Sequence, residues 1–115
     1  MEPSKFEIVK RELVEILKPL GPDRVILFGS HATGTAGEES DIDLFLVKNG
    51  LPKEEVREYL FQARRRLRKL VFKYRVAFDL FGDSSERMRW RIEALNDPFY
   101  REIQEEGVVL WETGR

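Results

Sequence analysis

The chain has 115 residues, of which 42% are hydrophobic and 36% are charged, which is enough for one domain with a core and too few for two. We therefore expect residues 1–115 to form a single domain. Twenty Lys and Arg residues against 21 Asp and Glu residues leave a net charge of −1, so the whole molecule has no electrostatic attraction to nucleic acid or to an anionic membrane. The absence of cysteine excludes disulfides, thiolate catalysis and Cys-ligated zinc, and one histidine cannot build a His-rich metal site. Any bound metal therefore needs oxygen ligands.

The N-terminal segment lacks the basic start and the continuous apolar run of a signal peptide. No apolar stretch approaches the length of a membrane span. The sequence therefore predicts a cytoplasmic protein without a membrane partner.

The first half of the chain predicts a helix, a strand, a loop and a second strand. Ser4 to Glu7 fits a helix capping box, and apolar residues follow at helical spacing until Pro19 ends the helix. Arg24 to Phe28 is a short β-branched and aromatic run typical of a buried strand. From Gly29 to Ser40 there is no apolar periodicity, so a loop with room for one helical turn is expected. Asp41 to Lys48 predicts the next strand.

A helix that begins near Pro52 follows, with an apolar stripe at helical spacing formed by Val56, Leu60, Ala63, Leu67 and Leu70. The third strand is expected within residues 71–81, most clearly over Arg75 to Phe81, with an end at Gly82 and Asp83. Asp83 and Glu86 have capping-box spacing, which predicts a helix over about residues 84–95.

The C-terminal segment predicts a short helix and a last strand. Asp97 and Pro98 cap the helix, Gly107 ends it, and Val108 to Trp111 forms the strand. The alternation of helices and strands along the whole chain predicts an α/β (α+β) fold, in which helices flank a mixed β-sheet.

Three aspartates are the candidate catalytic and metal-binding residues. Asp41 and Asp43 are two apart on a predicted strand, so both carboxylates leave the same face. Two adjacent negative charges favour a bound cation, and Mg²⁺ takes oxygen ligands from one or two carboxylates together with substrate phosphates. Asp79 interrupts an apolar strand, which predicts a buried or half-buried carboxylate that needs a partner. If the strands are neighbours, the three carboxylates can share two ions roughly 3.5–4 Å apart; the alternative is an ion pair of Asp79 with Lys73 or Arg75.

Gly29 and Ser30 form a candidate phosphate-binding turn at the end of the first strand. Glycine allows close backbone approach, and the backbone amides and the Ser30 hydroxyl can donate hydrogen bonds to phosphate oxygens. The glycine spacing from Gly29 to Gly34 is that of a P-loop, but Thr35 and Ala36 stand where that motif requires Lys and then Ser or Thr. The sequence thus indicates a phosphate site whose charge is neutralised mainly by metal.

Gly29-Ser30, Gly34, Ser40-Asp41-Ile42-Asp43-Leu44 and Asp79, taken in this order, resemble the signature of the DNA-polymerase-beta-like nucleotidyltransferase superfamily, and above all its minimal (MNT) branch. The order of elements and the closing segment from Gly107 to Glu112 are also similar, so the resemblance spans nearly the whole chain.

The resemblance implies a Mg²⁺-dependent enzyme that transfers AMP from ATP to a hydroxyl acceptor. It implies that Gly29, Ser30 and Ser40 bind the nucleotide, and that Asp41, Asp43 and Asp79 hold two metal ions, with Asp79 also helping to activate the acceptor. Because the chain has almost no residues left for an acceptor module, a helical HEPN-domain protein is the expected partner and acceptor, as in a toxin–antitoxin pair.

Two departures from the family pattern leave alternatives open. Thr33 and Gly37 stand where the family often has arginines, although His31 could donate to a phosphate in partial compensation. A silent antitoxin that acts by contact alone is one alternative, and transfer to a small molecule or an RNA end at an oligomer interface is another. The basic run from Arg64 to Lys69 predicts a solvated or partner-facing helix side and not a nucleic-acid site. The base of the nucleotide, the acceptor and the homo- or hetero-oligomeric state stay open.

Overall fold

The strands form one mixed sheet in the computed structural model, which describes residues 1–37 and 41–114. Its strands are β1 (Arg24–Phe28), β2 (Ile42–Val47), β3 (Phe78–Asp83) and β4 (Val108–Glu112), in the order β3-β2-β1-β4. β1 runs antiparallel to β2 and β4, whereas β2 and β3 are parallel. A parallel pair needs a crossover connection, and α3 (Val56–Tyr74) provides it.

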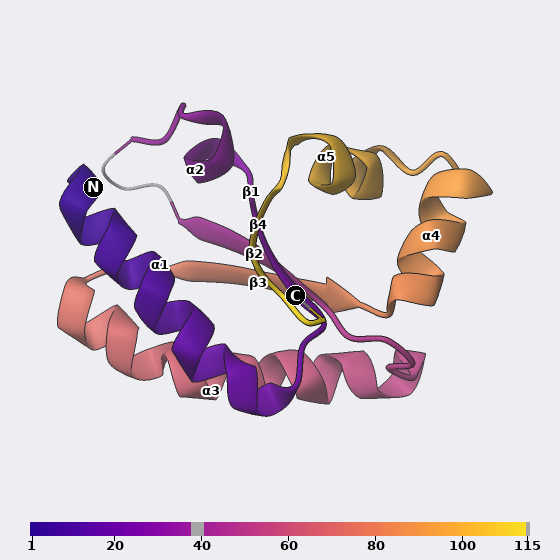
Figure 1. The fold of residues 1–115 in the computed structure, drawn as a ribbon, viewed down its shortest axis with the longest axis horizontal. Coiled ribbons are helices and arrows are strands. Elements are labelled where there is room, and N and C mark those ends of the chain that lie inside the picture. Colours follow the sequence, from indigo (N-terminus) through magenta and orange to yellow (C-terminus); the bar gives the residue numbers. More distant parts are fainter. Residues whose placement is uncertain (38–40, 115) are drawn as a thin grey trace.

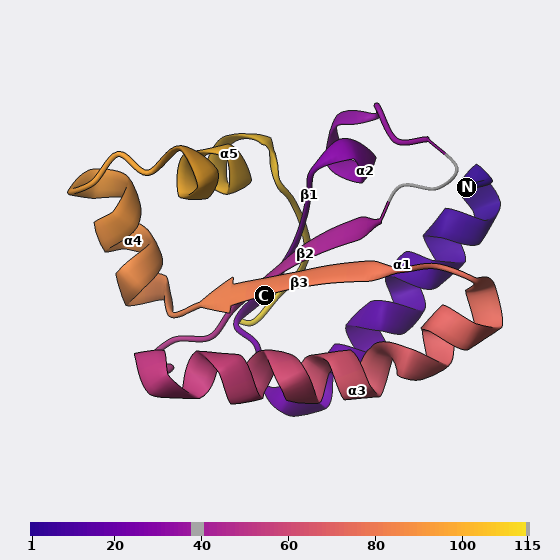
Figure 2. The same ribbon diagram turned by 180° about the vertical axis from the view of Figure 1, so that it is seen from behind.

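The helices cover both faces of this sheet. Besides α3 they are α1 (Pro3–Leu17), α2 (Ser30–Thr33), α4 (Ser85–Glu93) and α5 (Pro98–Glu106), with the 3₁₀ turns η1 (Lys18–Leu20) and η2 (Lys53–Glu55). α1 and α3 lie on one face and α4 and α5 on the other (Figures 1 and 2). The mixed sheet flanked by helices that the sequence predicted is confirmed. Within the described residues, no helix has the length and apolar character needed to cross a membrane.

Alternation along the strands builds a separate core on each face. The core beneath α1 and α3 includes Leu44 of β2 together with Leu13 and Leu67 of the two helices. The opposite core contains Phe45 of β2 with Met88 of α4 and Ile103 of α5. Successive residues of a strand point to opposite faces, so β2 contributes to both layers and is buried on both sides.

The boundary between the third helix and the third strand was predicted wrongly. The helix continues to Tyr74, which packs partly buried against the core beneath α1 and α3, and Arg75 ends it in the left-handed conformation at φ 56°. β3 therefore starts at Phe78 and includes the two residues, Gly82 and Asp83, that were expected to end it. Residues 71–74 continue the helix, because packing of its apolar side against the core outweighs their local β propensity.

The helix caps agree with the sequence in one case and differ in two. Asp97 caps α5 by accepting from the amides of Phe99 at 3.0 Å and Tyr100 at 3.5 Å, as predicted. In α4 the capping residue is Ser84, which accepts from the Arg87 amide at 3.0 Å, and not Asp83. α1 already begins at Pro3, so Ser4 lies inside the helix.

Candidate active site

The sheet brings the three predicted aspartates together. Asp43 and Asp79 are direct partners in the register of the parallel strands β2 and β3, each at the second residue of its strand. Asp41 immediately precedes β2 and lies two residues before Asp43, so it belongs to the same side. That side also carries Phe45 and faces the layer of α4 and α5. The carboxylates therefore gather at one end of two neighbouring strands.

Asp79 is exposed, which corrects the expectation of a buried or half-buried carboxylate. Asp79 lies near the start of the edge strand β3, whereas Leu80 on the opposite face and Asp83 at the other end of the strand are buried. The alternative ion pair is not formed either, since Lys73 pairs with Glu12 at 3.5 Å and, within the described residues, no salt bridge joins Asp79 to Lys73 or Arg75. Asp79 is thus available to a ligand from solvent.

The carboxyl of Asp43 has a raised pKa. Partial burial is the main cause that raises the pKa of its carboxyl, and the charges of Asp79 and Asp41 raise it further. His31 opposes this shift, whereas Glu102 on α5 adds to it. The half-buried carboxylate therefore sits in a negative environment that a cation would relieve.

Gly29 is needed because the carboxylate of Asp43 lies directly against its backbone. The residue has a φ of 73°, and a Cβ atom added there would be 2.1 Å from Oδ2 of Asp43. Any other residue at this position would have to displace the carboxylate. The end of β1 and the start of β2 are in this way packed together at the site, as the pairing of Phe28 with Asp43 requires.

The turn after Gly29 is a short helix that ends at Gly34. The amides of Ala32 and Thr33 donate to the carbonyl of Gly29 at 3.0 and 3.2 Å, and the hydroxyl of Thr33 contacts that of Thr35 at 2.9 Å. Thr33 therefore holds the turn together, and the family's arginine has no counterpart at this position. Ser30 is the first residue of this helix and is half-buried next to the aspartates. Ser40, the third predicted nucleotide-binding residue, lies outside the described residues.

His31 is held beside the aspartates by a helix distant in sequence. Its ring stacks on that of Phe6 in α1, with centroids 4.8 Å apart and planes at 24°. Sequence reasoning did not find Phe6, nor the proximity of Glu102 to Asp43. Glu102 is one residue before the buried Ile103 on an amphipathic helix, and nothing in the sequence indicates that α5 packs over this end of the sheet.

The donor chemistry of the site fits a hard divalent cation. Three carboxylates share one side of the sheet, and burial together with the charges of Asp79 and Asp41 raises the pKa of Asp43. Within residues 1–37 and 41–114, no group of three or more acidic, histidine or cysteine side chains is already spaced to enclose a metal ion. A closed cage is not required for Mg²⁺, which is held by one or two carboxylates and takes its remaining oxygens from phosphates and water.

Comparison with known proteins explains this arrangement. The family model of the nucleotidyltransferase domain matches residues 9–109, a span that contains all three aspartates and Gly29. The chain belongs to this family. It is accordingly a nucleotidyltransferase, an enzyme that transfers a nucleotide group.

Similar proteins agree with this assignment. The nucleotidyltransferase is 35% identical over 88 residues to a Methanocaldococcus jannaschii protein named "Putative protein adenylyltransferase", a match covering 76% of this chain and 77% of that protein. Among solved structures, a toxin–antitoxin structure with AMP-PNP has a TM-score of 0.56 at 22% identity and covers 91% of this chain and 74% of its own. A nucleotidyltransferase from Sulfolobus solfataricus has a TM-score of 0.54 at 22% identity, covering 98% and 91%. These structures show that the fold is shared.

Proposed function

We propose that this nucleotidyltransferase transfers AMP from ATP to a hydroxyl group on a partner protein. The observation that carries the proposal is the register of Asp43 with Asp79 on adjacent parallel strands, with Asp41 two residues away. Such a cluster of carboxylates would hold a divalent cation, and the cation would in turn bind and align the negative phosphates. The similarity to a protein named as an adenylyltransferase supports protein as the acceptor class.

In this proposal Asp41, Asp43 and Asp79 hold Mg²⁺, and Gly29, Ser30 and Ser40 bind the triphosphate. Two Mg²⁺ ions, when bound, would neutralise the phosphates and stabilise the charge on the attacking and leaving oxygens. Ser30 donates from its hydroxyl to a phosphate oxygen, and Gly29 lets the phosphates approach the backbone. His31, oriented by Phe6, adds a donor beside Asp43.

The transfer itself is an in-line displacement at the α-phosphorus. The acceptor oxygen forms a bond to this phosphorus while the bond to the β-phosphate oxygen breaks, and pyrophosphate leaves. Asp79 accepts the proton of the acceptor hydroxyl. Its exposure on an edge strand supports this role, because an acceptor on another molecule has to reach it from solvent.

The acceptor in our proposal is a HEPN-domain partner, and the nucleotidyltransferase acts as its antitoxin. Structural neighbours include toxin–antitoxin complexes, which supports a partner protein of this kind. The product of the adjacent gene is incubated with the enzyme, ATP and Mg²⁺, and its intact mass is measured. We expect one added adenylate on the partner and none with the double variant Asp41→Asn and Asp43→Asn. An unmodified partner with folded wild-type enzyme would contradict the proposal.

A second candidate is neutralisation of the partner by contact alone. It is favoured by Thr33, whose hydroxyl is used inside the α2 turn where the family often has an arginine for phosphate. The double variant Asp41→Asn and Asp43→Asn distinguishes adenylylation from neutralisation by contact. Under contact neutralisation the variant still protects cells from the partner, whereas under adenylylation it still binds the partner and no longer protects.

A further inference from the structure

Two adjoining hollows lie between α1 and α3, on the layer opposite the aspartates. Their volumes are about 730 and 410 Å³, and they share Glu15, Ile16 and Lys69. Figures 1 and 2 show α1 crossing α3 at an angle on the same side of the sheet. The active-site aspartates belong to the other face, which carries Phe45 and the helices α4 and α5. A molecule bound between α1 and α3 would therefore leave the active site open.

The hollows are strongly basic, although the whole chain has a net charge of −1. The basic side chains that line them are Arg11, Arg65, Arg66, Arg68, Lys69 and Lys73, against the two acidic residues Glu12 and Glu15. The acids stand on α1, where Glu15 pairs with Lys18 at 2.9 Å and Glu12 pairs with Lys73 at 3.5 Å. The α3 wall is thus basic, and the α1 wall is mixed in charge.

Two phenylalanines on α3 are exposed to solvent next to these arginines. Phe72 is 73% exposed and Phe61 is 49% exposed. Together with Arg65 and Arg68 they follow the spacing i, i+4, i+7 and i+11, which places all four side chains on one stripe of the helix. The guanidinium of Arg65 lies 6.0 Å from the centre of the Phe61 ring. We call these four residues the α3 seam.

The spacing of the α3 seam is the one by which two helices pack along each other, with alternating steps of three and four residues. Its apolar ends and cationic centre call for a complementary helix with carboxylates in the middle and apolar residues at both ends. Solvent-exposed phenylalanines are stabilised when such a surface covers them. Charge and spacing therefore indicate the same kind of occupant.

A nucleic acid fits this surface less well. Its backbone follows a continuous positive track, and the carboxylate of Glu15 lines the same hollow as Arg65, Arg68 and Phe72. A protein helix can place a basic or polar side chain of its own opposite that carboxylate. We propose that the α3 seam is a docking surface for an acidic amphipathic helix of a partner protein, separate from the active site.

The proposal is tested with a fluorescent peptide helix of about 20 residues, long enough to form a stable helix against the seam. The peptide carries leucines opposite Phe61 and Phe72 and glutamates opposite Arg65 and Arg68, and a scrambled peptide of the same composition is the control. Fluorescence anisotropy measures binding to the full chain. We expect the designed peptide to bind at least about tenfold more tightly than the scrambled one, with affinity falling as salt is raised.

Two variants of the seam examine the two kinds of contact separately. Arg65→Glu with Arg68→Glu should weaken peptide binding about tenfold or more. Phe61→Ser with Phe72→Ser should weaken it to a similar extent, and the size of this second loss should depend less on the salt concentration. All four residues lie on the exposed side of α3, so circular dichroism should show folded proteins.

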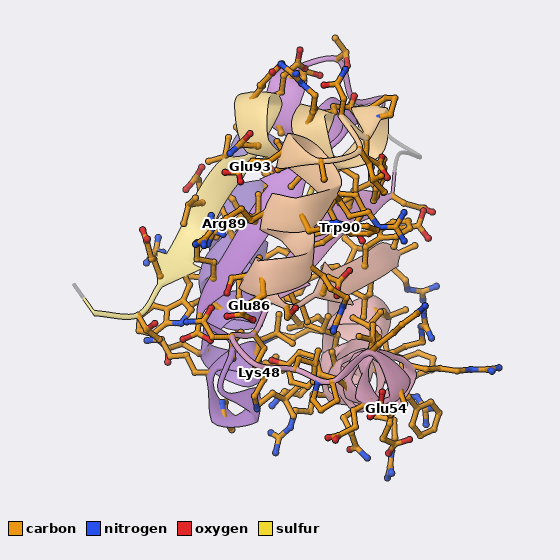
Figure 3. All side chains as sticks on the ribbon, turned by 90° about the vertical axis from the view of Figure 1, so that its right-hand side faces the viewer. Lys48, Glu54, Glu86, Arg89, Trp90 and Glu93 are labelled. Atoms are coloured by element: carbon orange, nitrogen blue, oxygen red, sulfur yellow. The ribbon has the colours of Figure 1, made fainter. Side chains whose placement is uncertain are left out.

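The matched control reverses the same amount of charge on the opposite layer, by Arg89→Glu with Arg101→Glu. Arg89 is exposed on α4 and is labelled in Figure 3, and Arg101 is exposed on α5. This control should bind the peptide as tightly as the wild type. Equal binding of designed and scrambled peptides would overturn the proposal, as would equal loss in the control.

Other occupants are distinguished in the same assay. If a uridine-rich RNA oligonucleotide bound more tightly than the designed peptide, and if Arg65→Glu with Arg68→Glu abolished that binding, the proposal would be overturned in favour of a nucleic acid. Self-association of the chain in sedimentation analysis that disappears in the same variant would overturn it in favour of a second copy. Peptide binding by Asp41→Asn with Asp43→Asn should be unchanged, so the result does not depend on the proposed transfer reaction.

Discussion

At Gly29 the backbone and the carboxylate of Asp43 occupy neighbouring space with no room for a side chain. The missing Cβ atom would lie 2.1 Å from Oδ2 of Asp43. An aspartate side chain can rotate away from such a contact at little cost to the fold. Substitution should therefore displace the carboxylate, in addition to the strain that any side chain has at a φ of 73°.

We predict that Gly29→Ala lowers nucleotidyl transfer about 100-fold, which is the effect of displacing a reacting group by about 1 Å. Transfer is measured by pyrophosphate release. Gly50→Ala is the control, since Gly50 has the same φ of 73° but open space around the missing Cβ atom. It should lose about 1 kcal/mol of stability and keep its transfer rate. Normal transfer by Gly29→Ala would show that the position of Asp43 is not critical.

The raised pKa of Asp43 predicts that its charge destabilises the metal-free enzyme. The folded chain holds this proton more tightly than the unfolded chain, in which the pKa is about 3.8. Folding stability should therefore fall as the pH rises from that value through the raised pKa, and the loss is complete above it. The principal causes are burial and the charges of Asp79 and Asp41.

Asp43→Asn should accordingly raise the melting temperature at pH 7 in the presence of a chelator, by roughly 1–4 °C, while abolishing transfer. Differential scanning fluorimetry measures the shift. Adding Mg²⁺ should stabilise the wild type and leave the variant unchanged. If the variant were less stable than the wild type in the presence of the chelator, the charge of Asp43 would be stabilised by neighbouring groups of the protein, and the prediction would be wrong.

β3 carries two aspartates on the same face with opposite environments. Asp79 is exposed, whereas Asp83 is 7% exposed at the other end of the strand. Asp83 accepts hydrogen bonds from the Tyr100 hydroxyl at 2.8 Å, the Ser84 amide at 2.9 Å and the guanidinium of Arg87. Burial and the bond to Asp83 raise the pKa of Tyr100 to about 12. Asp83 thus joins β3 to α4 and α5.

We predict that Asp83→Asn destabilises the protein by about 2–3 kcal/mol, because it leaves Arg87 and Tyr100 without their charged partner. Asp79→Asn should change stability by no more than about 0.5 kcal/mol, as expected for an exposed residue, and should lose transfer. Urea unfolding and pyrophosphate release give the two quantities. If Asp79→Asn kept full activity, the role assigned to Asp79 would be wrong.

β2 is a central strand that, like β1, contributes residues to both cores. Leu44 is fully buried beneath α1 and α3, and Phe45, at 1% exposure, packs against α4 and α5. Phe45 lies 5.6 Å from Tyr100 and 6.4 Å from Phe99, measured between ring centres. Neither helical layer can bury its apolar face without this strand.

Both layers should therefore unfold in one transition. Leu44→Ala is expected to cost about 2–5 kcal/mol and Phe45→Ala about 3–5 kcal/mol. Urea unfolding followed by tryptophan fluorescence, which reports Trp90 of α4 and Trp111 of β4, should coincide with unfolding followed by circular dichroism. Separate transitions for Phe45→Ala would show that α4 and α5 can detach.

Much of this fold follows from local sequence patterns. The shared face of Asp41 and Asp43 at β2, the glycine after β1 and the Asp97 cap of α5 were predicted, because each depends on residues adjacent in the chain. The start of β3 was predicted wrongly, since residues 71–74 are compatible with either a helix or a strand by local preference. Packing of Tyr74 on the core decides the matter.

The sequence by itself determined which chemistry is present: Asp41, Asp43 and Asp79, the turn at Gly29 and Ser30, and an otherwise near-neutral chain without cysteine. Only the tertiary structure decided how these groups meet. Strand pairing places Asp79 beside Asp43, and the packing of α1 and α5 brings Phe6 to His31 and Glu102 toward Asp43. The physical reason is that a carboxylate's burial and electrostatic partners depend on segments far apart in sequence, which local periodicity does not encode.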